Sequence, residues 1–372
     1  MIADIIFWAA AAVCVYVYLG YPLLLGLLRT AIRNPVDKAA YEPFVSLLIP
    51  AYNEARVIRQ KIQNSLTLDY PADHLEIVVV SDGSTDGTAE IAQEMADDRR
   101  VRVIAYPVNR GKILAMNDTV PQLRGEIVVF SDASSMLMPD AVRELAANFH
   151  DLKVGAASGV YKLKKTGHTS IGGSEELYWK YETFIKAQEA ALDSILGGHG
   201  HLHAIRRELY PFPPADTIND DYVISVRIVS RGYRAAYEPK AVGYEDAAEM
   251  AGFGRRVRIM TGNVQQLREI PALLWPPRVL PLFFFLSHKA GRLAVPLAMI
   301  TLLAANLFLL GHPFYLLLMV LQLVFYALAV LGAAFPLKPK ILRLPYYFGM
   351  INAAAFFGIY HALSGRRRLA WK

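Results

Sequence analysis

Cysteine is almost absent from this sequence, and its scarcity excludes several kinds of protein. Among 372 residues the single cysteine is Cys14, which lies inside an apolar run. One thiol cannot close an intramolecular disulfide, and it cannot supply a cysteine-based metal site. The sequence also lacks internal repeats, low-complexity tracts and a disordered tail. Any chemistry that the chain performs must therefore come from other side chains.

The sequence is also poor in net charge, at only +6. Its basic residues gather beside apolar segments, and they include Arg29, Arg33, Lys338, Lys340, Arg343, Arg366, Arg367 and Arg368. A surface that binds nucleic acid would instead show a basic face with interleaved aromatic residues in the polar part. The pattern favours a membrane surface of anionic lipids as a partner and argues against nucleic acid.

Hydrophobic residues make up 54% of the chain, but they are not spread evenly. They concentrate near both ends, whereas residues 43–270 have the composition of a water-soluble domain. Ile5–Leu28 is long enough to cross a bilayer, which takes roughly 20 residues. No basic residue precedes this segment, whereas Arg29 and Arg33 follow it. A cleavable signal peptide is the alternative, but it needs a basic start. The positive-inside rule then places the polar domain in the cytosol.

The apolar part near the end of the sequence contains further candidate spans. Gly291–Leu310 and Phe314–Phe335 are long enough to cross a bilayer, and Tyr346–Leu363 is marginal. Val279–Leu286 is too short to span and is typical of a segment in the interface. Three crossings after a cytosolic domain would leave the basic residues 366–368 outside, against the positive-inside rule. Either the last segment does not cross or the rule fails here, and the basic tail favours a cytosolic C-terminus.

Short β-branched runs alternate with helical patterns in the polar part. The runs are Val45–Ile49, Glu76–Ser81, Val101–Ala105 and Glu126–Ser131, and the helical stretches are Ala55–Leu66, Thr88–Ala96, Lys112–Leu123 and Asp140–Phe149. Such alternation predicts an α/β fold with a mainly parallel sheet covered on both faces. In such sheets ligands bind beyond the carboxyl ends of the strands. The residues just after each strand are therefore the candidates for a site.

Polar motifs follow the first two predicted strands. The first strand runs into residues 50–54 (PAYNE) and the second into residues 81–88 (SDGSTDGT). Tyr52 can stack on a base, and the carboxylates of Glu54 and Asp82 can accept hydrogen bonds from a ring N–H or from ribose hydroxyls. The Asp-Gly pair alone is typical of a tight turn. Two such motifs at neighbouring strand ends indicate a nucleotide site.

Together these motifs resemble the donor-binding half of the family 2 inverting glycosyltransferases, and in particular their cellulose-synthase-like membrane branch. The resemblance extends to Asn109–Lys112. It implies a nucleotide-sugar-binding, GT-A-like α/β domain flanked by transmembrane helices. It also implies a nucleotide-sugar donor, with a UDP-sugar favoured, whose nucleoside lies against Tyr52, Glu54 and Asp82. Lys112 would neutralise a phosphate, and a solvated lysine at a helix start is the alternative.

Asp132 follows the strand Glu126–Ser131 and resembles the first acid of the family's DxD motif. The acids of that motif hold the diphosphate through a divalent metal. Mg²⁺ and Mn²⁺ prefer hard oxygen ligands of this kind. Ser134 stands where the second acid is usual. The resemblance therefore implies Mg²⁺ or Mn²⁺ at Asp132, in a site that lacks one of its usual ligands.

Three histidines alternate within the segment Gly197–Arg207. In a strand His199, His201 and His203 would share one face, and three imidazoles on one face could bind zinc. The segment also resembles the family's small-residue stretch beside the acceptor site. That resemblance implies that Gly200 and His201 border the acceptor, with the imidazole bonding to sugar hydroxyls.

The adjacent acids Asp220 and Asp221 are the strongest catalytic signal. Inverting transfer needs a base that removes the acceptor hydroxyl proton as the anomeric carbon is attacked. A neighbouring acid raises the pKa of one member of such a pair. The pair resembles the family's Glu-Asp or Asp-Asp motif, and its spacing to Arg227 places Asp221 at the base position with Asp220 beside it. An acidic N-cap for a helix from Tyr222 is the alternative.

A basic segment resembles, with departures, the family's Gln-x-x-Arg-Trp motif. Arg258 occupies the arginine position, while Arg255 replaces the glutamine and Ile259 replaces the tryptophan. Arginines can bind a departing diphosphate, although basic residues near a membrane segment often only contact lipid headgroups. In processive members the tryptophan stacks on the acceptor sugar. Its replacement favours the addition of a single sugar or short-range addition.

These patterns combine into a membrane-bound enzyme with three parts. Residues 1–40 are expected to form a transmembrane anchor, residues 41–272 a cytosolic glycosyltransferase domain, and residues 273–372 an interfacial segment with C-terminal transmembrane helices. The expected activity is transfer of a hexose from a nucleotide-sugar to a glycan or lipid-linked acceptor, in polysaccharide or glycolipid synthesis at the plasma (inner) membrane. A non-catalytic scaffold that binds nucleotide-sugar or polysaccharide is the alternative, which the intact Asp220–Asp221 pair disfavours.

Overall fold

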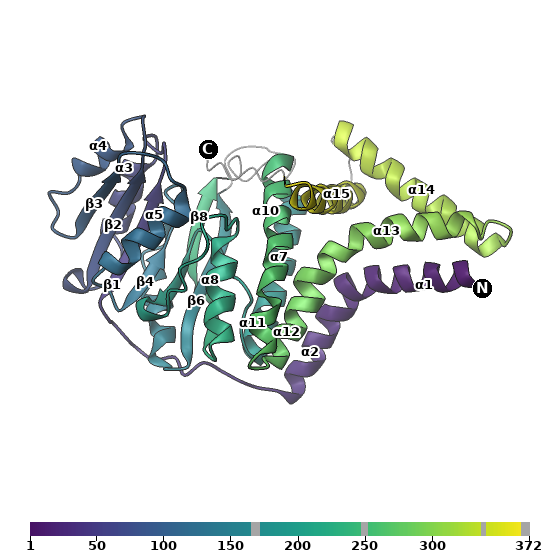
Figure 1. Cartoon of the computed structure of the whole chain (residues 1–372), viewed down its shortest axis with the longest axis horizontal. Coiled ribbons are helices and arrows are strands. Elements are labelled where there is room, and N and C mark those ends of the chain that lie inside the picture. The colour runs from purple at the N-terminus through teal and green to yellow at the C-terminus, as the bar shows by residue number, and fades with distance from the viewer. Residues whose placement is uncertain (165–171, 247–251, 336–339, 366–372) are drawn as a thin grey trace.

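The computed structural model describes residues 1–164, 172–246, 252–335 and 340–365. It contains an α/β domain built on one sheet and a group of long apolar helices (Figure 1). The sheet lies at one end of the molecule, and the N-terminus lies at the far end of the apolar helices. The sheet and the membrane-type segments expected from the sequence are therefore separate in space.

Within the described residues the sheet has eight strands in the order β3-β2-β1-β4-β7-β6-β8-β5. The strands are β1 Val45–Ala51, β2 Leu75–Asp82, β3 Val101–Tyr106, β4 Ile127–Phe130, β5 Met136–Leu137, β6 Val154–Lys164, β7 His203–Arg206 and β8 Arg234–Asp246. Strands β3, β2, β1 and β4 pair in parallel, and so do β6 and β8. β7 runs antiparallel to β4 and β6, and β5 is antiparallel to β8. The predicted mainly parallel α/β sheet is confirmed, with β7 and β5 as antiparallel additions.

Helices cover both faces of the parallel half of the sheet, which explains why its strands are apolar at nearly every position. The helices of the domain are α3 Ile58–Leu66, α4 Thr88–Gln93, α5 Lys112–Thr119, α6 Ala141–Ala146, α7 Gly172–Leu192 and α8 Asp220–Ser230, with short turns η2 Ala72–His74, η3 Val120–Gln122, η4 Ala147–His150 and η5 Arg207–Leu209. Every residue of β1 and β2 is buried. Leu47 and Ile49 of β1 share a core with α3, whereas Leu48 between them shares the opposite core with α5.

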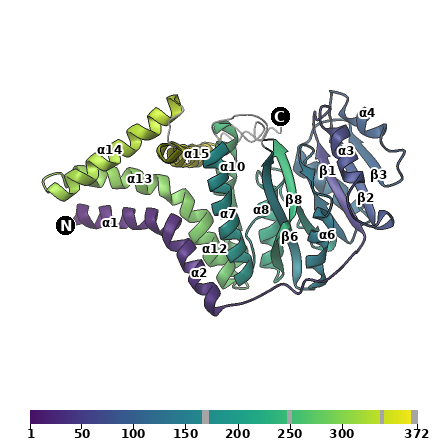
Figure 2. The same cartoon turned by 180° about the vertical axis from the view of Figure 1, so that it is seen from behind.

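Three helices are long and apolar enough to cross a membrane, among the residues that the structure describes: Ile2–Ala31, Val279–Leu307 and Pro313–Ala334. The first consists of α1 Ile2–Val15, η1 Tyr16–Gly20 and α2 Tyr21–Ala31, the second of α12 Val279–Phe284, η7 Phe285–Ala290 and α13 Gly291–Leu307, and the third is α14 Pro313–Ala334. Between the α/β domain and the second span lie α10 Phe253–Gln265, η6 Gln266–Glu269 and α11 Ile270–Leu274. After the third span come η8 Lys340–Arg343 and α15 Leu344–Leu363. α1 and α13 run side by side (Figures 1 and 2).

The C-terminal part can be compared with the sequence expectation at two places. The sequence pattern treats residues 279–286 as a short interfacial segment, but the structure joins them to α13 in one continuous helix. The reason is that His288 bonds to Glu189 inside the protein and does not end the helix at the lipid headgroups. The marginal segment, α15, is not among the three candidate spans found in the described residues, and it packs on α10.

α7 and α10 stand between the sheet and the candidate spans in both views (Figures 1 and 2). Met260 of α10 packs with Tyr347 and Ile351 of α15 in a small apolar core. Gly358 allows the close approach of these two helices, since a Cβ there would lie 2.7 Å from the Cβ of Met260. α15 therefore braces α10 from the side of the apolar helices.

Candidate active site

A cavity of about 680 Å³ lies beside the carboxyl ends of β1 and β4 and gathers most of the predicted site residues. The predicted residues that line it are Glu54, Lys112, Asp132, Gly200, His201, Asp220, Asp221 and Arg258. They come from distant parts of the chain, so only the fold brings them together. Tyr52 and Asp82 are not among the lining residues.

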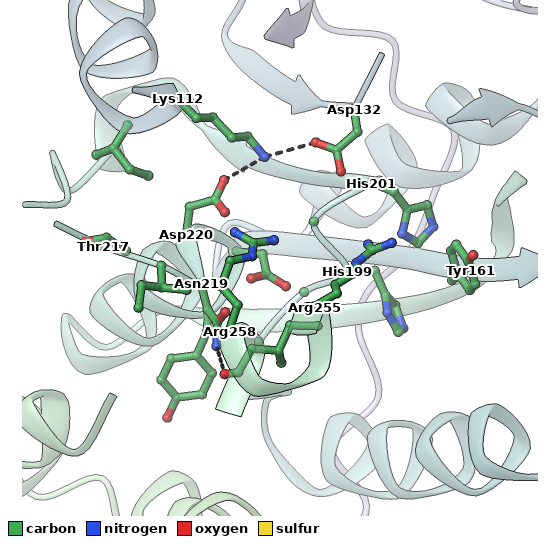
Figure 3. A pocket seen from close by; sticks show the side chains of 18 of the residues that line it. Lys112, Asp132, Tyr161, His199, His201, Thr217, Asn219, Asp220, Arg255 and Arg258 are labelled. Carbon is green, nitrogen blue, oxygen red and sulfur yellow. Dashed lines mark hydrogen bonds and ion pairs between the residues drawn. The ribbon is translucent and has the colours of Figure 1, made fainter. Parts of the chain in front are cut away.

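Lys112 joins two of the predicted acids across the cavity (Figure 3). Its Nζ lies 3.0 Å from Asp132 Oδ1 and 3.1 Å from Asp220 Oδ2. Burial alone would lower the pKa of Lys112, but these two carboxylates outweigh burial and raise the pKa. Lys112 is therefore a fixed cation in the cavity, rather than the solvated lysine that a helix start would also allow.

The adjacent acids lie in the first turn of α8, two residues earlier than the helix start expected at Tyr222. The helix dipole favours negative charge at this end. Neither acid caps the helix, because the N-cap is Asn219 and it makes no side-chain capping bond. Asn219 Nδ2 instead donates to the Ile259 carbonyl at 3.1 Å, which ties this turn to α10. The position of Asp220 and Asp221 therefore depends on both helices.

Asp221 faces the part of the cavity next to the Gly200 backbone. A Cβ on Gly200 would lie 4.0 Å from Asp221 Cγ. Burial, followed by the charge of Asp220, raises the pKa of Asp221 to about 6. Nearby lysines oppose this shift without cancelling it. A carboxylate with this pKa is ionised at neutral pH and can still accept a proton.

The three histidines lie in one buried segment but are not gathered as a metal site. His203 of β7 stacks on Phe130 with ring centroids 4.7 Å apart, and His201 meets Tyr161 edge-on at 4.7 Å. Burial lowers the pKa of His201 to about 3 and that of His203 to about 4, so both rings are neutral near pH 7. Within the described ranges, no group of three His, Cys, Asp or Glu side chains is placed to hold a metal. The zinc alternative therefore has no structural support.

The two nucleotide motifs lie side by side at the ends of β1 and β2. Asn53, at a φ of 55°, accepts a hydrogen bond from the Thr85 N–H at 2.9 Å. Asp82 is fully buried and accepts from the backbone N–H groups of Arg110 and Gly111, the latter at 2.7 Å. The Asp82 carboxylate thus holds the loop before α5, the helix that carries Lys112 into the cavity.

Sequence reasoning missed a group of charged residues around the loop that follows β4. Ser134 Oγ donates to Glu245 Oε1 at 2.8 Å, and Glu245 lines the cavity at the end of β8. Lys61 of α3 is fully buried, and its Nζ donates to Ser131 Oγ at 2.7 Å and to the Ser135 carbonyl. Burial lowers the pKa of Lys61 to about 7, although nearby carboxylates oppose the shift. The feature of the sequence that could have identified Glu245 as a site residue was its position at the end of a strand.

The wall of the cavity nearest the apolar helices comes from α7 and η7, which the sequence motifs did not mark. Glu182 and Lys186 of α7 and Lys289 of η7 line it. Lys186 Nζ donates to the Gly198 carbonyl at 3.1 Å, and burial lowers the pKa of Lys186 to about 8. The sequence does contain an indication of this wall. The charged residues 182, 186 and 189 recur with helical spacing and therefore share one face of α7.

α10 supplies the arginines of the cavity. Arg255 and Arg258 both line it, and Figure 3 shows their side chains extending into it. Ile259 lines it as well. The arginines therefore face the same space as the acids of α8.

The comparisons with known proteins agree with this geometry. A family model described as glycosyltransferase like family 2 matches residues 43–266. Because the match covers more than half of the chain, the chain belongs to this family and is a glycosyltransferase. Poly-beta-1,6-N-acetyl-D-glucosamine synthase of Staphylococcus aureus (strain COL) is 28% identical over 231 residues, which are 60% of this chain and 55% of that protein. The protein of the same name from Staphylococcus epidermidis is 27% identical over 232 residues, with the same shares. The chain thus spans about half the length of these curated relatives.

One solved structure resembles almost the whole chain. The mannosyltransferase PcManGT from Pyrobaculum calidifontis, in complex with GDP-Man and Mn²⁺, is 25% identical with a TM-score of 0.76. The likeness covers 98% of this chain and 99% of that one. The GT-A-like fold with flanking apolar helices that the sequence predicts is therefore confirmed. Membership of an enzyme family also favours catalysis over the scaffold alternative.

Proposed function

We propose that the chain is a membrane-bound inverting glycosyltransferase that moves a hexose from a nucleoside-diphosphate sugar to a hydroxyl of a glycan or lipid-linked acceptor. The observation that carries this proposal is the meeting of Lys112, Asp132 and the Asp220–Asp221 pair in one cavity. An acid with a raised pKa beside a fixed charge network is typical of a catalytic site. The curated relatives are named as polysaccharide synthases, which supports a role in making cell-surface polysaccharide or glycolipid.

The donor diphosphate would find charged partners on two sides of the cavity. Lys112 and Arg258 supply positive charge, and the Asp132 carboxylate is a hard oxygen donor of the kind that Mg²⁺ and Mn²⁺ bind. The presence of GDP-Man and Mn²⁺ in the similar mannosyltransferase supports a divalent metal here. When bound, the metal would offset the charge of the departing diphosphate. The nucleoside would lie against Tyr52 and Glu54, and both UDP- and GDP-sugars are donors to compare.

Asp221 is the proposed base of the reaction. As the acceptor oxygen attacks the anomeric carbon, its proton passes to the Asp221 carboxylate. The new glycosidic C–O bond forms while the bond from the anomeric carbon to the diphosphate breaks, so the configuration inverts. Asp220 lies beside the base and forms an ion pair with Lys112. Gly200 leaves room for the acceptor next to Asp221, with His201 in the same wall.

The Asp221→Asn variant tests this assignment, since asparagine keeps the shape of the side chain and removes the base. We expect transfer to fall by about a hundredfold or more, the range in which general-base catalysis contributes, while the Kd of the donor changes little. Transfer would be measured with radiolabelled UDP- and GDP-sugars, and donor binding by calorimetry on the purified full chain. Ser230→Ala is a matched control, because its hydroxyl bonds only within the last turn of α8. Unchanged transfer by the Asn variant would remove Asp221 from the role of base.

The candidate spans support a particular arrangement in the membrane. One span precedes the α/β domain and two follow it, so the domain and residues 340–365 would lie on the same side. Arg29 follows the first span, and the positive-inside rule makes this side the cytosol. With α15 not crossing, the described chain would end on the cytosolic side, and the basic residues 366–368 lie outside the described residues. Residues 1–40, 41–272 and 273–372 would then be anchor, catalytic domain and membrane part.

The acceptor side of the cavity supports addition of one sugar or a few. Ile259 offers an aliphatic side chain where a processive enzyme would stack an indole on the acceptor sugar. This cavity suits a glycan or lipid-linked acceptor at the membrane, because η7, which is part of the second candidate span, forms one wall together with α7.

A further inference from the structure

Ser134 leaves the proposed metal site one carboxylate short, and the fold brings another acid beside it. Ser134 Oγ donates to Glu245 Oε1 at 2.8 Å across a separation of 111 residues. Glu245 is 5% exposed, and both Glu245 and Asp132 line the catalytic cavity. Because the two acids lie so far apart in the sequence, no local motif reveals that they share a site.

The sheet explains why Ser134 and Glu245 meet. β5 begins two residues after Ser134 and pairs antiparallel with the end of β8, with Met136 opposite Tyr244. In an antiparallel pair each step back along one strand is a step forward along the other. The register of β5 against β8 therefore places the loop before β5 next to Glu245. This proximity does not depend on how a flexible side chain is oriented.

A buried lysine forms hydrogen bonds to the same loop. Lys61 Nζ donates to Ser131 Oγ at 2.7 Å and to the carbonyl of Ser135. These two bonds fix both flanks of the loop that carries Asp132 and Ser134, and Lys61 itself is fully buried. A ligand site needs such support, because its side chains must be held to within about 0.5 Å.

We propose that Glu245 supplies the second carboxylate of the divalent-cation site, in place of the acid that is missing at position 134. The inference rests on the proposed function, since the cation is the one that would bind the donor diphosphate. Mg²⁺ is usually held by one or two carboxylates together with substrate phosphates and water. Asp132 and Glu245 match that ligand set, and the Ser134 hydroxyl orients the Glu245 carboxylate through the hydrogen bond that it donates.

Cation binding can be measured separately from catalysis, by electron paramagnetic resonance of Mn²⁺ with the purified full chain and either UDP or GDP. We expect Glu245→Gln to weaken Mn²⁺ binding by about tenfold or more, at least the loss that follows removal of a supporting residue at a metal site. The double variant Ser134→Asp/Glu245→Gln should recover most of this loss, because it returns an acid to the loop. Glu238→Gln is the matched control, since Glu238 is a buried acid of β8 that bonds to Lys38 and does not line the cavity.

The outcomes separate this inference from the proposed function. Unchanged Mn²⁺ affinity in Glu245→Gln, together with a loss in Asp132→Asn, would remove Glu245 from the site and leave the metal role of Asp132 standing. A loss in Glu245→Gln that the double variant does not recover would make Glu245 a structural residue only. Normal Mn²⁺ binding by Asp132→Asn would contradict the metal role itself. Thermal unfolding of each variant shows whether the proteins compared are folded.

Discussion

At the scale of single residues, the environment of Asp221 decides what its carboxyl group can do. Burial disfavours the charged form, and the neighbouring Asp220 adds like-charge repulsion, so the pKa of Asp221 rises from its usual range to about 6. Asp220 instead forms an ion pair with Lys112 beside the proposed base. Two adjacent acids therefore have different surroundings, which fits them for different roles.

The rate of transfer should consequently fall as the pH drops below about 6, because protonation of Asp221 would remove the proposed base. Asp220→Asn removes the nearby negative charge, so the pKa of Asp221 should decrease and the acidic limb of the profile should move to lower pH. The measurement is kcat/KM as a function of pH for both proteins. An acidic limb at the same pH in both would contradict the electrostatic coupling between the two acids.

Residues that directly follow a strand could be proposed from the sequence, because parallel strands bring their carboxyl ends to one edge of the sheet. Asp132 reaches the cavity in this way. Asp82 is the last residue of β2, yet its carboxylate accepts hydrogen bonds from backbone N–H groups of a loop that no sequence pattern placed beside it. Glu245 and Lys186 were missed because their approach depends on strand register and on the docking of α7, which involve partners distant in the sequence.

At the scale of elements, α10 connects the candidate active-site cavity with the apolar helices. Arg258 projects from it into the cavity, while Met260 packs against α15. Asn219 of the α8 turn bonds to the Ile259 carbonyl of α10, so a displacement of α10 would reach the acids as well. The closeness of α10 and α15 is therefore expected to matter for activity.

Gly358→Ala tests this dependence. The added Cβ would lie 2.7 Å from the Met260 Cβ and 2.9 Å from the Thr261 backbone nitrogen, and backbone atoms cannot move aside without shifting α10. We expect a loss of about 1–3 kcal/mol of stability, as for other overpacked sites, together with a lower rate of transfer. Gly254→Ala is the matched control on α10, because nothing lies within 4 Å of its Cβ position. Thermal unfolding and transfer assays of both variants provide the comparison, and equal behaviour would contradict the bracing role of α15.

α7 shows why hydropathy could not delimit every element. Glu189 accepts a hydrogen bond from the Tyr21 hydroxyl at 2.7 Å and bonds to His288 at 2.8 Å. One buried carboxylate thus joins α2, α7 and η7. The sequence pattern ends an apolar segment before His288, because hydropathy along the chain does not show that the imidazole has a buried partner on another helix.

At the scale of the whole molecule, the sheet and the candidate spans lie at opposite ends, with the cavity next to α7 and α10 between them (Figure 1). An acceptor held at the membrane and a water-soluble donor would therefore reach the cavity from different directions. The strand and helix pattern predicted the sheet and the apolar segments, since both depend on short-range periodicity. The joining of residues 279–307 and the docking of α15 depend on contacts between distant elements and could not be predicted in this way.

Cysteine labelling can test the arrangement of the spans in a Cys14→Ser background. Gly311 lies between the second and third candidate spans with open space around it, and Leu152 is an exposed residue of the α/β domain. We expect a membrane-impermeant maleimide to label Gly311→Cys in intact cells and to label Leu152→Cys only after the membrane is opened. Labelling of Leu152→Cys in intact cells would contradict a cytosolic domain.

In the proposed reaction a single displacement in this cavity transfers the sugar, with Asp221 as the base. The most direct measurement is the anomeric configuration of the product, read from the coupling of the anomeric proton by nuclear magnetic resonance after transfer by the purified full chain. We expect a configuration opposite to that of the donor, because in the proposed reaction the acceptor attacks from the face away from the diphosphate. A product with the configuration of the donor would contradict it.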